Sequence, residues 1–383
     1  MTVPSKPDVP APTPAVTPLH ARVSRAALEH NLSRLREQSP SGRVIAVVKA
    51  NAYGHGMLEA ARTFAQAGAW RIGVATVEEA LELRGAGLDA PLMAWLYGPG
   101  AELKDAVAQD IELGVSTGHA LEQVRLAARA TGRQARVHLK LDTGLGRNGF
   151  VLTEAVPAAR VIVEAPELAL TGVFSHLANA DWPDDEANDA QEDLFREVLA
   201  QIRELPGAQD AVAHLANSPA ALTRPSAAFD AIRPGLSLYG LSPLEGRSAQ
   251  DLGLRPALEL HSAVVNLKRV PAGHGASYGL SYRAPEETTF ALVPGGYGDG
   301  ILRTASGQAE VSIGGRRHPV AGRIAMDQFV VDVGDAPVRL GEPVTLIGAE
   351  EGDPGADDWA RWAGTINYEV VTQLAARLRR EWT

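Results

Sequence analysis

Between residues 44 and 240 the sequence repeats one unit eight times: a short apolar run, followed by a stretch with helix-forming composition. Each run has the length and flanking residues of a buried strand. The eight runs are VIAVVK (44–49), RIGVAT (71–76), PLMAWLY (91–97), IELGVS (111–116), RVHLKLD (136–142), LALTGVFSH (168–176), AVAHLA (211–216) and IRPGLSLYG (232–240). Strands alternating with helices are typical of α/β folds, and eight such units predict a (β/α)8 TIM-type barrel.

The stretches between the runs are rich in Ala, Leu, Glu and Arg, which favour helices. Examples are residues 57–68, 77–87 and 119–132, and each ends in a glycine suited to a helix C-cap. Thr117 and Thr153 stand where N-caps are expected. An open doubly wound sheet is the alternative architecture. The barrel is favoured because polar residues follow the strands all around the set, as they do in barrel active sites.

After about residue 253 the pattern changes to short strands separated by tight Gly turns, which predicts a mainly antiparallel β domain. The last segment, TINYEVVTQLAARLRREWT (365–383), predicts a helix. We therefore expect a barrel domain over 19–252 and a β domain over 253–383, with residues 19–24 able to pair with either. The Pro-rich segment 1–18 lacks the apolar core of a secretion signal and is expected to be a disordered tail.

Composition excludes several classes of function. The net charge is −10 and no run of Lys or Arg occurs, which argues against binding to nucleic acid or to an anionic membrane. The absence of cysteine excludes disulfides, thiolate nucleophiles and Cys-type zinc sites, and no metal site is expected. No stretch approaches the ~20 apolar residues of a membrane span. These features predict a soluble, cytoplasmic protein.

Lys49 ends the first apolar run, immediately before the Gly-rich turn ANAYGHG. Desolvation at such a position lowers the pKa of an amine toward the free base that attacks carbonyl groups. A lysine that merely caps a strand end is the ordinary alternative. However, only five of the 36 Lys and Arg residues are lysines, so a lysine in an apolar context indicates a need for an amine that arginine cannot supply.

The segment VVKANAYGHG resembles the attachment motif for pyridoxal 5'-phosphate (PLP) in the alanine racemases, and the resemblance extends over residues 20–375. It implies a PLP-dependent enzyme of fold type III that interconverts L- and D-alanine, supplies D-alanine for cell-wall peptidoglycan, and acts as a homodimer. In that family the lysine corresponding to Lys49 binds the cofactor covalently and also serves as one of two catalytic bases. Tyr53 is implied to lie close to the cofactor.

The phosphate of a barrel-bound cofactor is commonly held by the loops after the seventh and eighth strands. Here those loops contain Ser218, which offers a hydroxyl, and the pair Gly235 and Leu236, whose backbone amides can approach an anion closely. Each of these segments taken alone is an ordinary turn. The resemblance adds Tyr368, in GTINYE, as a further phosphate ligand.

The resemblance of AIRPGLSLYG places Arg233 against the pyridine nitrogen of the cofactor. Arginine only donates hydrogen bonds, so the nitrogen opposite it stays unprotonated and the ring is a weak electron sink. The segment HGASYGLSY matches the catalytic-tyrosine segment and makes Tyr278 the second base. In the family this tyrosine reaches the cofactor from the partner subunit.

Other matches concern the substrate and its surroundings. LDTGLGRNGF supplies Arg147, implied to orient the substrate carboxylate and the phenolic oxygen of the cofactor. Lys140 corresponds to a lysine often found carbamylated, and a carbamate would hold Arg147 in place. His176 is implied to lie near the Tyr278 network or the cofactor ring, and the backbone of Met326 to contact substrate.

Two further segments of the β domain bear on the expected site. Tyr297, in GYGDG, resembles a residue that narrows access to the site. The family often has Cys-Met-Asp where this chain has Ala325-Met326-Asp327, so any role of a thiol is absent, whereas contacts through the Met326 backbone are unaffected.

The same sequence bears on several alternative functions. GLGRNG (144–149) fits the dinucleotide pattern G-x-G-x-x-G, but it follows the fifth strand instead of the first and leads into Phe-Val-Leu. A broad-specificity PLP racemase would share every motif. A related PLP decarboxylase usually uses a cysteine, which this chain lacks. A non-catalytic PLP-binding protein would be a lone barrel, without a β domain that carries Tyr278 and Tyr368.

Overall fold

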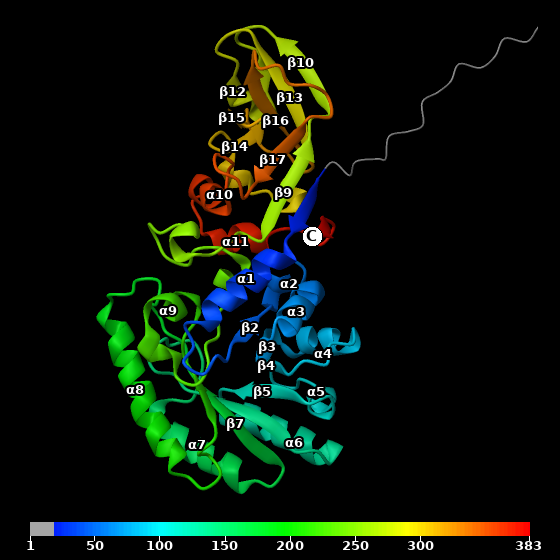
Figure 1. The fold of residues 1–383 in the computed structure, drawn as a ribbon. Helices are drawn as coiled ribbons and strands as arrows, with labels where there is room; N and C mark the ends of the chain where they lie inside the picture. The colour runs from blue at the N-terminus through cyan, green and yellow to red at the C-terminus, as the bar shows by residue number, and fades with distance from the viewer. Residues whose placement is uncertain (1–18) are drawn as a thin grey trace, which may run out of the picture.

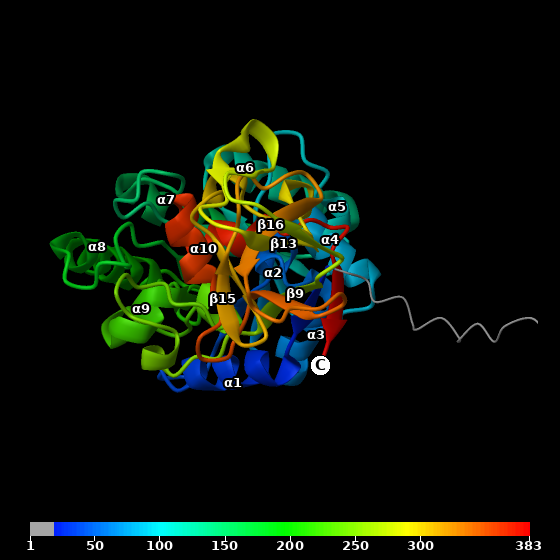
Figure 2. The same ribbon diagram turned by 90° about the horizontal axis from the view of Figure 1, so that it is seen from above.

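The computed structural model describes residues 19–383, so the segment 1–18, with its predicted disordered tail, lies outside the described residues. A β/α barrel forms one half of the molecule, and a β domain is stacked on it (Figure 1). Seen along this stacking direction, the β-domain strands lie over the middle of the ring of barrel helices (Figure 2). The predicted fold class is confirmed, with differences in detail.

Seven parallel strands, each joined by hydrogen bonds to the next in the sequence, curl into the barrel wall. They are β2 (Ile45–Val47), β3 (Arg71–Thr76), β4 (Leu92–Leu96), β5 (Ile111–Val115), β6 (Ala135–Lys140), β7 (Leu168–Phe174) and β8 (Val212–His214). All seven fall within one residue of the predicted runs or inside them. The first is shorter than expected, so Lys49 lies just beyond the strand end.

The eighth predicted strand, 232–240, is wrong as a regular strand. Its first residues do close the barrel: the Ile45 amide donates to the Ile232 carbonyl (2.9 Å), and the Arg233 amide donates to the Ala216 carbonyl (2.8 Å). Only one parallel bridge, Val44 to Ile232, forms there. Residues Leu236–Tyr239 then turn into a 3-10 helix, because the chain leaves the barrel wall at Gly235.

Helices cover the outside of the barrel and the junction between the barrel and the β domain. They are α1 (Arg25–Arg36), α2 (Lys49–Tyr53), α3 (Met57–Gln66), α4 (Val77–Gly85), α5 (Lys104–Ala108), α6 (Gly118–Thr131), α7 (Leu152–Glu164), α8 (Glu186–Arg203), α9 (Ser218–Thr223), α10 (Ala356–Ala363) and α11 (Asn367–Thr372). Among residues 19–383, no helix combines the length and the apolar character needed to cross a bilayer.

The predicted helix caps had mixed outcomes. Thr117 caps α6 as predicted, since its hydroxyl accepts from the Ala120 amide at 3.1 Å, and Gly132 ends that helix in a left-handed conformation. The predicted cap at Thr153 is wrong. Helix α7 begins two residues earlier than that cap implies, at Leu152 with Val151 as its cap, and Val151 offers no side-chain acceptor.

The β domain contains one six-stranded sheet and two smaller ones. The large sheet has the order β15 (Arg316–Pro319), β14 (Glu310–Ile313), β17 (Pro343–Ile347), β9 (Leu258–Ala263), β1 (His20–Val23), β18 (Arg379–Trp382). The others are β10 (Asn266–Val270) with β13 (Thr288–Pro294) and β16 (Gln328–Gly334), and the pair β11 (Gly275–Ala276) with β12 (Tyr282–Arg283). All pairings except β1 with β18 are antiparallel.

The two ends of the described chain meet in this sheet. Strand β1 pairs with β9 and, in parallel, with β18, so residues 20–23 lie in the β-domain sheet. The predicted C-terminal helix over 365–383 is therefore wrong in its second half, because residues 379–382 form a strand beside β1. The domain limits 19–252 and 253–383 themselves stay a prediction.

Gly240, at the end of the 3-10 helix, should tolerate no side chain. It has φ +76°, and a Cβ there would lie 1.7 Å from the Arg255 carbonyl oxygen. We expect Gly240→Ala to lower the free energy of unfolding by roughly 2–4 kcal/mol, from left-handed strain and backbone overlap. Gly246→Ala is the control, because Gly246 has φ +72° with no atom within 4 Å of a Cβ. Equal losses in urea denaturation would contradict the overlap argument.

Candidate active site

Lys49 is followed by a left-handed turn. The four residues Ala50–Tyr53 all have φ between +52° and +54°, although none is glycine. For a residue with a Cβ, this conformation costs about 1–2 kcal/mol of free energy. Such strain persists only where surrounding contacts impose it, and it is concentrated at functional sites.

Several contacts impose this turn. The Ala50 amide donates to Glu79 Oε1 (2.7 Å), and the His55 ring contacts the carbonyls of Ala52 (3.1 Å) and Tyr53 (2.9 Å) through Nδ1. From the C-terminal strand, Arg380 Nε donates to the Gly54 carbonyl at 2.7 Å. The turn on the barrel is therefore held by β18 of the other half of the molecule.

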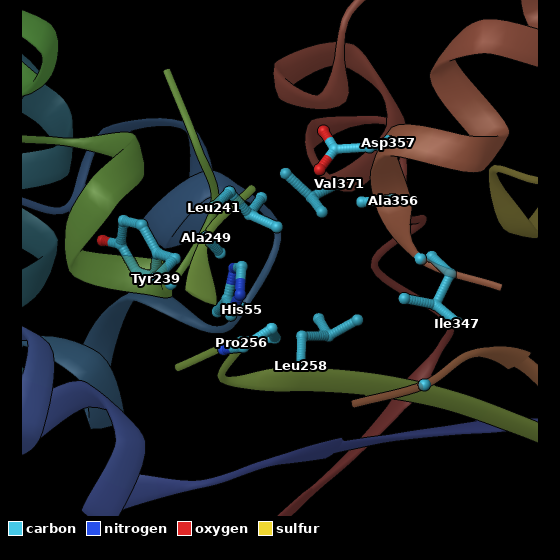
Figure 3. Close-up of a pocket in the computed structure, with 13 residues that line it drawn as sticks. His55, Tyr239, Leu241, Ala249, Pro256, Leu258, Ile347, Ala356, Asp357 and Val371 are labelled. Carbon is cyan, nitrogen blue, oxygen red and sulfur yellow. The ribbon is translucent and has the colours of Figure 1, made fainter. Parts of the chain in front are cut away.

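A cavity of about 70 Å³ lies between the barrel and the β domain, on the side of this turn where His55 stands (Figure 3). His55 packs against Tyr239, with ring centroids 4.5 Å apart, and Asp357 and Val371 line the cavity as well. The His55 Nε2 atom is buried and has no hydrogen-bond partner among residues 19–383. None of the predicted site residues lines this cavity, so it is not the candidate active site.

Several basic side chains lie close to Lys49. Burial lowers the pKa of Lys49, and the neighbouring positive charges of Arg147 and Arg233 lower it further, against an opposing effect of Glu79. Burial and the same two arginines also lower the pKa of Lys140 to about 8. The effects on the two pKa values indicate that Lys49, Lys140, Arg147 and Arg233 lie close together. Their mutual repulsion favours the free-base form of the lysines.

A second cluster of residues lies beside these cations. It consists of Ser218, Gly235, Tyr53 and Tyr368. The Ser218 hydroxyl accepts from the amides of Gly235 (2.9 Å) and Ser237 (3.3 Å), which ties together the two loops predicted to bind phosphate. A Cβ on Gly235 would lie 2.1 Å from the Tyr53 hydroxyl, so only glycine fits there. The rings of Tyr53 and Tyr368 have centroids 6.3 Å apart. Burial raises the pKa of both phenols, that of Tyr368 to about 12, which keeps them as donors.

Arg233 is buried, with 6% of its surface exposed, and donates only to neutral acceptors. Nη1 contacts His214 Nδ1 at 2.6 Å, and Nη2 contacts the Ser175 carbonyl at 2.8 Å and His176 Nδ1 at 3.1 Å. Burial, followed by repulsion from Arg147, lowers the pKa of Arg233 to about 10, so the group remains cationic at neutral pH. Burial and then Arg233 hold the pKa of His176 well below its usual range.

The other predicted residues form a second, exposed group on the β domain. Tyr278 is 71% exposed and Met326 is 53% exposed, and Tyr297 is exposed beside them. The Tyr297 amide donates to the Ala325 carbonyl (3.0 Å), which joins the two loops. Tyr278 stands in a strained turn, between Ser277 and Gly279 at positive φ. Within residues 19–383, no hydrogen bond or ion pair links this group to the Lys49 group.

Several residues at the site were not singled out from the sequence. They are Glu79 and Arg380, which hold the turn, His55, and the buried polar residues Glu112, His138 and His214. The last three had a recognisable signal, because each is a polar residue inside an apolar strand. Glu79 and Arg380 had none, since acidic and basic residues in helices and chain ends are ordinary.

The residues present fit PLP. A cofactor with a phosphate and a phenolate would neutralise the cations that repel one another here, and a buried lysine with lowered pKa suits its aldehyde. The phosphate would meet the Ser218 hydroxyl, the phenols of Tyr53 and Tyr368, and the backbone amide of Leu236. Lys49 and Arg233 thus lie in one cationic cluster, and the Ser218 hydroxyl lies beside it through its hydrogen bond with the Gly235 amide.

Two family profiles match this chain nearly end to end. "Alanine racemase, N-terminal domain" matches residues 23–243 and "Alanine racemase, C-terminal domain" matches residues 257–382. The alanine racemase of Thermobifida fusca is 46% identical over 367 residues, covering 95% of this chain and 97% of the relative. That of Mycobacterium tuberculosis strain H37Rv is 45% identical over 368 residues, covering 94% and 95%.

Solved structures agree with these sequence matches. The alanine racemase of D-cycloserine-producing Streptomyces lavendulae superimposes with a TM-score of 0.93 at 45% identity, covering 96% of this chain and 98% of the other. The enzyme of Streptomyces coelicolor A3(2) gives a TM-score of 0.92 at 45% identity, covering 96% and 99%. The likeness extends over both halves of the molecule.

Proposed function

This chain belongs to the alanine racemase family, and from that premise we propose that it interconverts L- and D-alanine with PLP by a two-base mechanism. It is an isomerase. We further propose that it works in the cytoplasm and supplies D-alanine for peptidoglycan. The observation that carries the proposed chemistry is Lys49, which precedes a strained turn and lies buried among cations that lower the pKa of its amine.

The chain's own residues account for binding. Ser218, Tyr53, Tyr368 and the amides of the 235–236 turn would hold the phosphate, and Arg233 would donate to the ring nitrogen. Arg147 is exposed, forms no ion pair within residues 19–383, and would orient the substrate carboxylate. A carbamate on Lys140 would turn its repulsion of Arg147 into attraction.

Proton transfer needs a base on each face of the substrate Cα. When bound, PLP supplies a conjugated ring that accepts electron density from that carbon. Lys49 removes or returns the Cα proton on one face, and Tyr278 does so on the other. Arg233 remains a cationic donor. It therefore cannot accept a hydrogen bond from a protonated ring nitrogen, as a carboxylate in its place would.

A direct assay tests the proposed function. The purified protein, supplied with PLP, should bring either enantiomer of alanine to zero optical rotation, and the cofactor should become covalently reducible onto Lys49. Serine and larger amino acids belong in the same assay. Comparable rates for them would favour the broad-specificity racemase, and no turnover of any amino acid would leave only the PLP-binding alternative.

A homodimer would complete the site. Tyr278, Leu280, Tyr297 and Met326 present exposed apolar surface on one part of the β domain, as expected for a protein contact. We propose that Tyr278 of each copy serves the Lys49 pocket of the other. Each site would then contain Lys49 and Tyr278 from different chains.

Mixing two inactive variants tests this arrangement. If Tyr278 acts across the interface, Lys49→Ala and Tyr278→Phe chains unfolded and refolded together should regain about a quarter of the wild-type activity, since half the dimers are mixed and each of these has one intact site. If both residues come from one chain, no intact site can form. Activity no higher than that of the separate variants would contradict the shared site.

A further inference from the structure

A line of buried polar side chains runs through the barrel, beside the apolar cluster of Ile45, Met93 and Phe174. Arg71, Glu112, His138, His214 and Arg233 are each at most 6% exposed, and together they run from the amino-terminal to the carboxyl-terminal ends of the strands. Burying so many polar groups is costly unless every one has a partner. Each of these five side chains has a hydrogen-bond partner within the group.

At the lower end, Glu112 anchors the line. Arg71 contacts both of its carboxylate oxygens, at 2.7 Å and 2.6 Å, and Arg136 contacts Oε1 at 2.5 Å. His138 Nε2 contacts Oε2 at 2.5 Å. Burial would raise the pKa of Glu112, but the hydrogen bonds from His138 and Arg71 outweigh burial and hold that pKa below its usual range.

From Glu112 to Arg233 the direction of every hydrogen bond is determined. Arg233 can only donate, so His214 Nδ1 must accept at 2.6 Å. A neutral His214 then carries its proton on Nε2 and donates it to His138 Nδ1 at 2.9 Å. His138 in turn carries its proton on Nε2 and donates it to Glu112. Burial lowers the pKa of both histidines, in agreement with neutral rings.

The surrounding barrel is shaped for these rings. A Cβ on Gly172 would lie 2.2 Å from His138 Nδ1, so glycine on β7 makes room for the imidazole. Phe174 stacks on His214, with centroids 5.0 Å apart and an interplanar angle of 7°. Two further acceptors, Ser175 and His176, take the other nitrogen of the Arg233 guanidinium.

We propose that Glu112 and His138 are positioning residues for Arg233: through this line of hydrogen bonds they select the His214 tautomer that accepts from Arg233 and thereby set the orientation of the guanidinium. The proposal deepens the proposed function and rests on it, because Arg233 is the group assigned to the cofactor ring. The relay from Glu112 to Arg233 spans three hydrogen bonds, and within residues 19–383 neither Glu112 nor His138 forms a hydrogen bond with Lys49 or Ser218.

A matched pair of substitutions at one position tests the relay. His138→Leu removes both hydrogen bonds, whereas His138→Gln offers an oxygen to His214 and an N–H to Glu112, as the imidazole does. In His138→Leu we expect kcat to fall roughly 10- to 100-fold, with KM for alanine changed less than about twofold. We expect His138→Gln to recover most of that loss. Glu167→Gln is the control, because Glu167 also pairs with two arginines, Arg125 and Arg129, but lies outside the relay.

A readout independent of turnover accompanies the kinetics. Nitrogen NMR of histidine-labelled protein loaded with PLP should show His214 as the Nε2–H tautomer in the wild type and in His138→Gln. In His138→Leu the Nδ1–H tautomer should appear, with the Arg233 guanidinium turned away from Nδ1, because the Nε2 proton has lost its acceptor. A general loss of stability would not change this tautomer, so the measurement separates positioning from packing.

The outcomes distinguish the two proposals. An unchanged His214 tautomer and wild-type kcat in folded His138→Leu would overturn the relay, whatever the substrate. A wild type that racemises no amino acid would overturn the proposed function, while the tautomer shift would still report on the relay. If His138→Leu does not fold, His138→Met replaces it with the same expectations, because it also lacks the N–H that meets Glu112. Wild-type tautomer and kcat in that variant overturn the relay equally.

Discussion

Replacing Lys49 with alanine should abolish racemisation, with a loss of at least about 10³-fold, together with covalent attachment of PLP. The lysine is expected both to bind the cofactor and to move a proton, so its loss removes two functions at once. The measurements are polarimetry with each enantiomer and borohydride reduction followed by peptide mapping. The variant should fold normally, because the turn is held by Glu79, His55 and Arg380, not by the lysine side chain.

The control for this experiment is the other buried lysine. Lys140 also has a lowered pKa and lies near the same arginines, so it is the one rival for cofactor attachment among the described lysines. Lys140→Met should retain the reducible cofactor, although substrate binding should weaken through Arg147. A cofactor that is still trapped covalently in Lys49→Ala, or lost in Lys140→Met, would contradict the assignment of Lys49.

Replacing Tyr278 with phenylalanine should leave cofactor attachment intact but lower racemisation by roughly 10²-fold or more, because one face of the substrate loses its base. The expected pattern is asymmetric. Exchange of the Cα hydrogen with deuterated solvent should persist for the enantiomer that Lys49 deprotonates and fall for the other. Equal loss of exchange from both enantiomers would mean that Tyr278 is not specific to one face.

A neighbouring tyrosine provides the matched control. Tyr282 lies on the same part of the β domain, but its hydroxyl donates to Asp332 at 2.6 Å, so its role in the structure is to hold that carboxylate. Tyr282→Phe should cost about 1 kcal/mol of stability and leave racemisation and its exchange pattern unchanged. A loss as large as that of Tyr278→Phe would point to damage of the β-domain surface instead of a lost base.

The strands of the barrel were predictable because a buried strand is encoded by consecutive apolar residues. Seven of the predicted runs became strands. The eighth, 232–240, has the same composition but turns into a 3-10 helix at Leu236. That departure depends on the Ser218 hydroxyl and the Tyr53 phenol packed against Gly235, which are neighbours only in the folded chain.

The candidate site likewise combines features encoded locally in the sequence with contacts between distant segments. The sequence by itself determined the barrel, the loops that carry Ser218 and Arg233, and the lysine before a Gly-rich turn, since each depends on residues close together in the chain. Only the tertiary structure decided that the Lys49 turn is left-handed, because its strain is imposed by Glu79 and Arg380, which lie 29 and 326 residues away from the groups they contact. It also decided that residues 379–382 pair with β1, and that Glu112 and His138 stand behind Arg233. Such contacts join segments distant in sequence, so no local pattern of residues encodes them.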